Sequence, residues 1–480
     1  MNKKINIHSK YNPQKESERF VETVDGSPLF IIISEPGESY LEKPLRKKFP
    51  KAKLIAVRYT DSMFLESDTL WDYVWRPADG NLLFFLINTI PDEHLGNTKF
   101  LAWEPSNRIW QEQAKYVWNI INKTVKTIQS IIYTRRVFGP KWFKNILKNT
   151  IYSENIVNLN IPKSDFLLAA AGPSLNSFFE IANAKIPILA VSSALQTLKF
   201  NNIIPDICIS TDGGFWACNH FRNINQNIPL LFPLEASVPS FVLKKNPLAV
   251  LNYNSILETV ILNELKIPSI SGKRNGTVAG TAVELLLENT EHNIFMTGLD
   301  LCATNGFSHS RPHESSIKIE NASKLLHPLA TELYKVNIDS RSLETYSAWF
   351  RGLKKEKTKR LFRLGYLGYE LPNIERIRFE QFAEKATPST QTLKTISVKT
   401  ASYKEKKNTV INILQNAEKN IVSQDLNELL SQNSVEKEII EMLCYKEFIE
   451  FLNNKNSNKS EILKSKIKTK LKTIIKGYLA

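Results

Sequence analysis

The sequence predicts an α/β protein with a central Rossmann-like, doubly wound parallel sheet, a smaller N-terminal α/β domain and a helical C-terminal domain. Three observations predict this class. Short apolar runs alternate with helical stretches between residues 151 and 335, as in a parallel sheet. Those runs lack polar alternation, which indicates strands covered on both faces. After residue 336 the spacing is helical and ends in a basic tail. The predicted domains are therefore 1–150, 151–335 and 336–480.

The N-terminal region begins with a strand, a turn, a helix and a second strand, which together form a βαβ unit. A third strand and a long amphipathic helix are expected to follow. The turn after the first strand contains Glu35 and Glu38, and glutamates repel phosphate, so this turn is a poor nucleotide site. In order, the expected elements are a strand at Leu29–Ile33, a helix at Tyr40–Phe49, strands at Lys53–Tyr59 and Leu82–Ile90, and a helix at Ser106–Tyr133.

The central region contains the densest alternation of strands and helices. Its runs of Val, Ile, Leu and Ala are short enough for strands and are separated by helical stretches. The predicted strands are Phe166–Ala171, Ile188–Ser192, Asp206–Ser210, Leu230–Phe232, Ala249–Asn252 and Asn293–Gly298.

Composition excludes several classes of protein. A chain of 480 residues with 42% hydrophobic residues can bury a large core without disulfides. Its apolar runs, such as Leu82–Ile87, are too short to span a membrane, and its polar start indicates no export signal. The four cysteines lack CxxC spacing, which favours reduced thiols and a cytoplasmic location. The sequence does not predict the oligomeric state.

The formal net charge of +15 does not indicate a nucleic-acid partner. The excess is densest in the last thirty residues, where eight lysines accompany one glutamate. A nucleic-acid surface usually combines arginines with aromatic residues. This tail combines lysine with isoleucine and leucine, as a solvated amphipathic helix does. It could contact a protein partner, or serve solubility alone.

The first candidate site is the segment Gly172-Pro173-Ser174-Leu175-Asn176, directly after the strand at Phe166–Ala171. Glycine allows the backbone to approach a ligand, and serine or asparagine can cap the next helix. Free amides at a helix start bind anions, so a nucleotide phosphate or a sugar carboxylate would fit. The alternative is an ordinary tight turn with a serine cap.

The second candidate is formed by Asp212 and Gly213, which follow the strand at Asp206–Ser210. Ligands gather at the carboxyl ends of strands in doubly wound sheets. The neighbouring Phe215 and Trp216 could stack on a base or a sugar. The alternative is a capped helix start with two core aromatics.

The third candidate is the start of the helix that ends near Glu288, where Gly276 and Thr277 follow Lys273 and Arg274. Two cations beside a glycine-containing helix start are typical of an anion site. The order of a Walker loop is missing. The alternative is a glycine-mediated contact between helix and sheet.

The fourth candidate combines Asp300, at the end of the last central strand, with His309 nine residues later. Histidine titrates near neutrality, which suits a general base. His309 and His313 are four residues apart, but Pro312 makes a shared helix face improbable, and a zinc site needs more ligands. No metal site is predicted. The alternative for His309 is a surface loop.

Taken in order, these elements resemble the MptE-like domain, which archaeal 6-hydroxymethylpterin pyrophosphokinases share with bacterial motility-associated factor (Maf) proteins. The motifs are Gly-Pro-Ser-Leu after a strand, a Pro-Asp…Asp strand, a glycine-containing helix start and Gly-Leu-Asp-Leu…Ser-His. They cover about Asn155 to Arg311. The upstream segment Ser9–Glu16 and the three-region layout also resemble Maf chains.

The resemblance implies cytoplasmic transfer of a nonulosonic acid, of the pseudaminic or legionaminic type, from a CMP-activated donor to Ser or Thr of flagellin. It implies a central domain similar to sialyltransferases and no need for a metal or other cofactor. The residues that would hold the CMP-sugar are Gly172, Pro173, Ser174, Asn176, Asp212, Gly213, Gly276 and Thr277. His309 would accept the proton of the acceptor hydroxyl, and Asp300 would orient His309 or the substrate.

Two other functions stay open. One is ATP-dependent pyrophosphoryl transfer to 6-hydroxymethylpterin with Mg²⁺, which does not explain two large flanking regions. The other is a non-catalytic, chaperone-like protein of flagellar assembly. Ala170 stands where a glycine is often found in the family, and its methyl group would narrow the approach to phosphate, which is compatible with the second alternative.

Overall fold

The structure is a computed structural model of the 480-residue chain. It describes residues 7–177, 185–222, 224–303, 307–331, 346–347, 349–365, 368–389 and 392–479. The chain divides into two compact units. The first comprises Met1–Gly139 with Leu443–Ile467, and the second comprises Pro140–Met442 with Lys468–Ala480. Each unit contains its own parallel sheet.

The sheet of the first unit has the strand order β3-β2-β1-β4, and every neighbouring pair is parallel. The three isoleucines of β1 show how both faces are covered. Ile31 and Ile33 pack with Leu54 on one face, and Ile32 packs with Ile55 on the other. The strands are β1 (Phe30–Ser34), β2 (Lys53–Val57), β3 (Tyr73–Trp75) and β4 (Thr98–Ala102).

The helices of this region are α1 (Pro13–Glu22), α2 (Glu42–Lys48), α3 (Leu82–Thr89), α4 (Glu104–Ile109) and α5 (Gln111–Tyr152), the last of which continues into the second unit. The strand predicted at Leu82–Ile90 is wrong, because this run is helix α3. The side chain of Asn81 caps it by accepting hydrogen bonds from the amides of Leu83 and Phe84. Its two fully buried residues, Leu82 and Leu86, are four apart, as in a helix.

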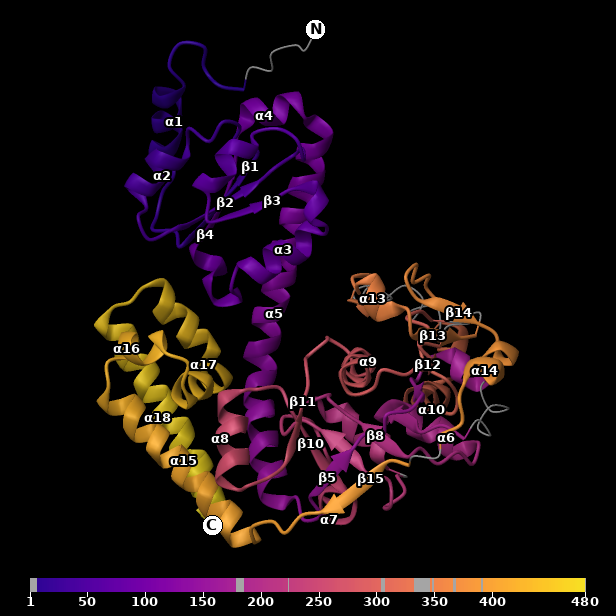
Figure 1. Cartoon of the computed structure of the whole chain (residues 1–480). Helices are drawn as coiled ribbons and strands as arrows, with labels where there is room; N and C mark the ends of the chain where they lie inside the picture. The colour runs from indigo at the N-terminus through magenta and orange to yellow at the C-terminus, as the bar shows by residue number, and fades with distance from the viewer. Residues whose placement is uncertain are drawn as a thin grey trace. The chain divides into compact units, whose positions relative to one another are not determined.

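The sheet of the second unit confirms the predicted fold class (Figure 1). Nine strands of described residues pair in the order β11-β10-β9-β8-β7-β6-β12-β13-β14, all parallel. The strands are β6 (Phe166–Ala169), β7 (Ile188–Val191), β8 (Ile207–Ile209), β9 (Leu230–Phe232), β10 (Leu248–Asn252), β11 (Ser269–Ser271), β12 (Ile294–Thr297), β13 (Leu361–Leu364) and β14 (Glu375–Ile377). The last two lie beyond residue 335, so the sheet extends past the boundary expected there.

The strand order places a topological switch point between β6 and β12. From β6 the chain moves outward strand by strand to β11, and it returns through helix α9 (Val278–Asn289) to β12, on the other side of β6. Ligands of doubly wound sheets bind outside the carboxyl ends of strands at such a point. The loops that follow β6 and β12 therefore form the edge of the sheet where a ligand is expected to bind.

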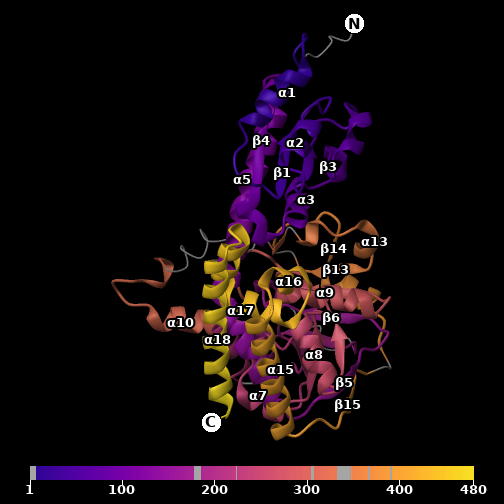
Figure 2. The same cartoon turned by 90° about the vertical axis from the view of Figure 1, so that its left-hand side faces the viewer.

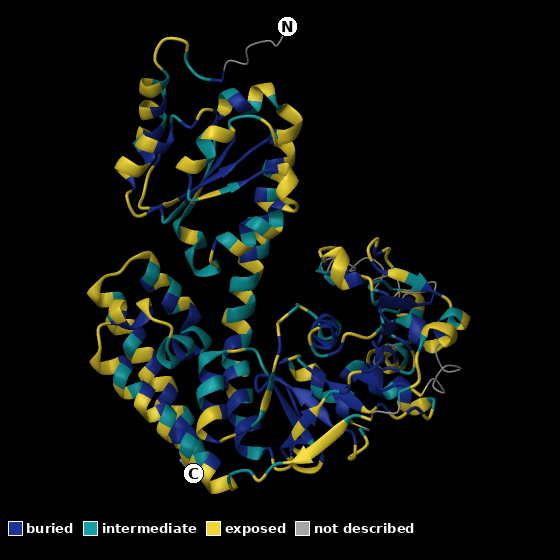
Figure 3. Ribbon diagram, in the orientation of Figure 1, coloured by how far each residue is buried: buried dark blue, intermediate teal, exposed yellow. Residues whose placement is uncertain are grey.

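Most described residues after Ser402 are helical, as predicted, whereas β13 and β14 are strands inside the region predicted to be helical. Residues 336–345 lie outside the described part. The helices are α15 (Tyr403–Ser423), α16 (Leu426–Ser431), α17 (Val435–Asn453) and α18 (Ser457–Leu479). The end of α18 runs beside α15 (Figure 2), where Lys472 Nζ lies 3.9 Å from Glu418 Oε1. Before them, β15 (Lys394–Ser397) pairs antiparallel with β5 (Val157–Asn160), and its residues are exposed (Figure 3).

The remaining helices of the second unit are short. They include η4 (Pro173–Ser177), η6 (Ser192–Ala194), α6 (Leu195–Phe200), η7 (Phe215–Phe221), α7 (Ser240–Lys245), α8 (Ile256–Glu264), α10 (Glu314–Ala322), α13 (Lys355–Thr358) and α14 (Phe379–Lys385). In the part of the chain that the structure describes, no helix is both long and apolar enough to cross a membrane.

Candidate functional site

The loops after β6 and β12 are held together at the switch point. The amide of Gly172 donates to the carbonyl of Gly298 (2.7 Å), and the amide of Gly298 donates to Ser174 Oγ (3.1 Å). Gly298 has a φ of +68°, and a Cβ there would lie 2.1 Å from the carbonyl oxygen of Ala170. Because no other residue tolerates both conditions, glycine is required at 298.

Asp300 fixes the first turn after β6. Its Oδ2 accepts a hydrogen bond from the amide of Ser174 (2.6 Å), and the residue is buried. Burial raises the pKa of Asp300, while hydrogen bonds from Ser174 and the charges of Arg363 and Arg376 oppose that rise. The amide and hydroxyl of Ser174, expected to bind a nucleotide, are thus bonded within the protein.

The segment that carries His309 is joined to the same turn. The amide of Ser310 donates to the carbonyl of Ala171 (2.7 Å), and the amide of Arg311 donates to Asn176 Oδ1 (3.2 Å). From helix α6, Thr197 Oγ1 lies 2.9 Å from Ser310 Oγ. The structure therefore brings two of the predicted motifs, 172–176 and 308–313, into direct contact.

His309 lies inside a cluster of imidazole rings. Its ring stacks on that of His313 with centroids 4.2 Å apart and planes 3° from parallel, and its Nδ1 lies 3.0 Å from Ser308 Oγ. Burial, together with the charge of His220, lowers the pKa of His309 to about 4. Burial also lowers the pKa of His313 to about 3. Both rings are therefore neutral at pH 7.

His220 and Glu314 belong to this cluster and were missed by the sequence analysis. His220 lies in η7, after β8, and Glu314 is the first residue of α10. His220 Nδ1 lies 3.3 Å from Glu314 Oε2, and His313 Nε2 lies 3.4 Å from the same oxygen. Burial raises the pKa of Glu314, but the hydrogen bond with His220 and the electrostatic effect of His313 outweigh it, so the pKa is lowered overall. The only signal in the local sequence that could have indicated His220 and Glu314 was that each follows a strand of the central sheet.

Asp212 and Gly213 shape the loop between β8 and η7. Asp212 Oδ1 accepts a hydrogen bond from the amide of Gly214 (2.7 Å). A Cβ on Gly213 would lie 2.3 Å from the ring of Trp142, so this glycine allows α5 to pack closely. Phe215 and Trp216 are 71% and 63% exposed, which excludes the core position considered for them and leaves both rings at the carboxyl edge of the sheet.

Gly276 and Thr277 lie at the start of α9, where Thr277 Oγ1 caps the helix by accepting from the amide of Gly280 (2.8 Å). The two neighbouring cations have acidic partners. Lys273 pairs with Glu284 and Glu288, and Arg274 pairs with Glu235. Their charge is thus largely neutralised by the protein.

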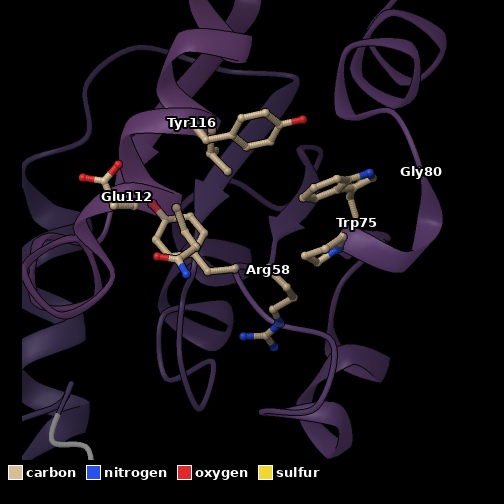
Figure 4. A pocket seen from close by; sticks show the side chains of 9 residues that line it. Arg58, Trp75, Gly80, Glu112 and Tyr116 are labelled. Atoms are coloured by element: carbon tan, nitrogen blue, oxygen red, sulfur yellow. The ribbon is translucent and has the colours of Figure 1, made fainter.

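A separate cavity of about 440 Å³ lies at the carboxyl edge of the first unit's sheet (Figure 4). Its walls include Trp75 and Tyr116, together with Glu112, whereas the guanidinium of Arg58 points away from Tyr116. The turn after β1, predicted to be a poor nucleotide site because of its glutamates, contains an ion pair. Glu35 is buried there, and its Oε1 lies 3.0 Å from Arg58 Nη1.

Comparisons with known proteins place this geometry in a family. Residues 141–306 match the family model described as 6-hydroxymethylpterin diphosphokinase MptE-like, which confirms the MptE-like domain indicated by the motifs. An "Uncharacterized protein" of Treponema pallidum (strain Nichols) is 42% identical over 370 residues, which are 77% of this chain and 83% of the relative. The chain belongs to the family of this treponemal protein.

A structural comparison covers almost the whole chain. The solved structure of the MAf glycosyltransferase from Magnetospirillum magneticum AMB-1 aligns with 97% of this chain and 82% of its own. The TM-score is 0.48 and the sequence identity is 12%.

Proposed function

We propose that this protein is a glycosyltransferase that moves a nonulosonic acid from a CMP-activated donor to a Ser or Thr hydroxyl of flagellin in the cytoplasm. On this proposal the modification is needed for flagellar assembly and motility. The observation that carries it is the joining of the 172–176 turn to the 308–313 segment at the switch point, through Ser310 and Arg311. The order of the four motifs and the MptE-like domain also support it.

In the proposed reaction, the acceptor oxygen forms a bond to the anomeric carbon of the donor, and the bond from that carbon to the phosphate oxygen breaks. CMP leaves with the electron pair, and His309 takes the proton of the acceptor hydroxyl. Because CMP is a good leaving group, positioning and charge stabilisation account for most of the rate. Asp300 is then a positioning residue, since its carboxylate holds the turn at Ser174.

The exposed rings of Phe215 and Trp216 fit the donor's base or sugar by stacking. Both polar groups of Ser174 are bonded within the protein. Asn176 is exposed, and although its Oδ1 accepts from the amide of Arg311, its side-chain amide nitrogen is the group of this turn proposed to contact the donor.

The test is an assay of the purified full chain with flagellin and either CMP-pseudaminic acid or CMP-legionaminic acid. The expected result is CMP release together with a mass increase of flagellin by one sugar residue. His309→Ala should slow turnover by roughly 100-fold or more, as loss of a general base does, while CMP binding persists. His292→Ala is the control, since this histidine is half exposed and lies near Asp165. Absence of transfer with both donors would refute the proposal.

The matched family model favours a second candidate function, pyrophosphoryl transfer from ATP to 6-hydroxymethylpterin. The same protein, incubated with ATP, Mg²⁺ and that pterin, would then release AMP. AMP release without sugar transfer to flagellin would replace the first proposal with this one.

A further inference from the structure

We propose that His220, His313 and Glu314 form a binding site for one divalent transition-metal ion of the zinc type. This inference stands independently of the proposed glycosyl transfer, because it rests on the geometry of the cluster alone. All three residues belong to the second unit. They come from two different segments, η7 after β8 and the start of α10 after β12, at the carboxyl edge of one sheet.

The spacing of the three ligand atoms fits a tetrahedral ion. His220 Nδ1 and His313 Nε2 lie 3.3 and 3.4 Å from Glu314 Oε2, and all three atoms lie within 4.8 Å of one another. A zinc ion holds nitrogen and oxygen ligands at about 2.0–2.2 Å, so two ligands at a tetrahedral angle are about 3.3–3.5 Å apart. Two of the three separations already have this value. The third separation, between the two imidazole nitrogens, is within 4.8 Å.

The chemistry of the donors selects the class of ion. Two imidazoles and one carboxylate suit zinc and neighbouring transition metals, whereas Mg²⁺ and Ca²⁺ prefer oxygen ligands. Three protein ligands leave a fourth position for water or substrate, as in catalytic zinc sites. The side chains of His220 and Glu314 are each 19% exposed, so the ion has a route from solvent and the fourth position stays accessible.

A second observation points to a missing ligand. His313 is 3% exposed, and its Nε2 has no hydrogen-bond partner among the residues that the structure describes. A buried polar atom without a partner is unfavourable. His313 Nε2 lies 3.4 Å from Glu314 Oε2. This distance is long for a hydrogen bond, but it suits two ligand atoms that bind the same ion.

The other nitrogen of the same ring has a partner for the metal-bound form. When Nε2 binds a metal, Nδ1 carries the proton, and Ser315 Oγ lies 2.7 Å away to accept it. Metal-bound histidines usually donate to such a partner. The amide of Ser315, which lies 3.1 Å from Nδ1, loses its hydrogen bond in that form. Metal binding thus competes with one cap of α10, and it is expected to change the order of this helix end.

The experiment uses the full chain, stripped with a chelator and titrated with zinc chloride by isothermal calorimetry. One zinc ion should bind per chain, and His220→Ala and Glu314→Gln should each weaken binding by at least about 100-fold. These two variants leave the cap of α10 by His313 intact, so a loss of folding is not expected. Circular dichroism of each stripped variant checks this.

His292→Ala provides the matched control for adventitious binding by imidazole, since His292 Nδ1 lies 3.8 Å from a carboxylate oxygen of Asp165. It should bind zinc as the wild type does. Cobalt substitution adds a direct readout, because a tetrahedral site gives intense visible absorption that His220→Ala should abolish. The proposal is overturned if the wild type binds no zinc, if binding survives His220→Ala and Glu314→Gln, or if Mg²⁺ binds at this site in preference to zinc.

Discussion

At the carboxyl edge of the first unit's sheet, one arginine lies between two carboxylates and contacts both. Arg58 is fully buried, with Nη1 3.0 Å from Glu35 and Nε 2.9 Å from Asp68. At the edge of the second unit's sheet, two buried carboxylates again accompany one arginine. Among the described residues, however, Arg274 forms an ion pair only with Glu235. Glu258 Oε1 accepts a hydrogen bond from the amide of Glu235 (3.2 Å). The other oxygen, Oε2, has no hydrogen-bond partner among the described residues.

This difference shows how two similar sheets acquire different chemistry. In the first unit Arg58 pairs with both carboxylates, so this closed edge leaves no described carboxylate without a partner. At the closed edge the described atoms without partners include Ser34 Oγ, Thr60 Oγ1 and Trp75 Nε1, which belong to uncharged side chains. The open edge of the second unit keeps atoms without partners on one carboxylate, Glu258, and on one imidazole, His313. Such atoms are the ones that a proton, an ion or a substrate can engage.

The first prediction tests the closed edge of the first unit, where Arg58 pairs with two carboxylates. Arg58→Ala removes the partner of two carboxylates and leaves Glu35 charged and buried, which should destabilise the first unit by about 3–5 kcal/mol. Hydrogen exchange of the full chain, read by mass spectrometry over β1, measures the loss. Arg46→Ala is the control, since Arg46 is 42% exposed beside Glu42 and Asp72 and should matter by less than about 1 kcal/mol. Equal losses in both variants would contradict the closed-edge interpretation.

The second prediction concerns Glu258, at the open edge of the second unit. Burial, with a contribution from Glu235, raises the pKa of Glu258 to about 8 from a usual value of 4.5, while Arg274 and the Glu235 amide oppose it and Glu438 adds to it. A folded-state pKa above the unfolded value means that the folded state binds the proton more tightly. The stability from this group is therefore complete below about pH 4.5 and declines as the pH rises towards 8.

Between pH 5 and pH 8 the wild type should lose about 3 kcal/mol relative to Glu258→Gln, whose amide does not titrate. Urea unfolding of both chains at each pH gives the difference. Glu264→Gln, an exposed position on the same helix, should follow the wild type. A difference between wild type and Glu258→Gln that stays constant with pH would show that Glu258 is charged throughout.

Local sequence patterns predicted the central sheet well because its strands are short, continuous and apolar. Leu230–Phe232 was predicted at its observed bounds, and β6, β7 and β12 within one or two residues. The same reasoning failed at Leu82–Ile90, since a short apolar run has no period that separates a strand from a helix. The strands β13 and β14 were missed because charged Arg363 and Glu375 interrupt their apolar pattern.

The candidate site was only half predictable. The turn after β6 and His309 could be identified from glycine, proline and histidine at strand ends. The contact of Asp300 with Ser174, however, joins residues 126 positions apart. His220 and Glu314 are 94 positions apart. No local pattern encodes which segments the strand order brings together. For this reason the sequence analysis considered only His309 and His313 as possible metal ligands and did not include His220.

The last prediction compares two glycines of the open edge that both have positive φ. At Gly298 (φ +68°) an added Cβ meets the Ala170 carbonyl at 2.1 Å, whereas at Gly276 (φ +73°) it meets nothing within 4 Å. Gly298→Ala should destabilise the second unit by about 2–4 kcal/mol through backbone strain and overpacking. Gly276→Ala should destabilise the second unit by about 1–2 kcal/mol, because only the strain of a positive φ is added there. Urea unfolding of the two variants measures both values.

If the glycines differ as expected, the switch point is held by close packing between the β6 and β12 loops, and the start of α9 is free to adapt. The same two variants then separate packing from binding in the CMP-sugar assay. Gly298→Ala should move the turn that contacts Ser310 and reduce turnover, whereas Gly276→Ala should change the apparent affinity for the donor with a smaller effect on the rate. Equal stabilities would instead mean that the β6 turn yields to an added methyl group, and that the contact between Gly172 and Gly298 does not fix the geometry of the site.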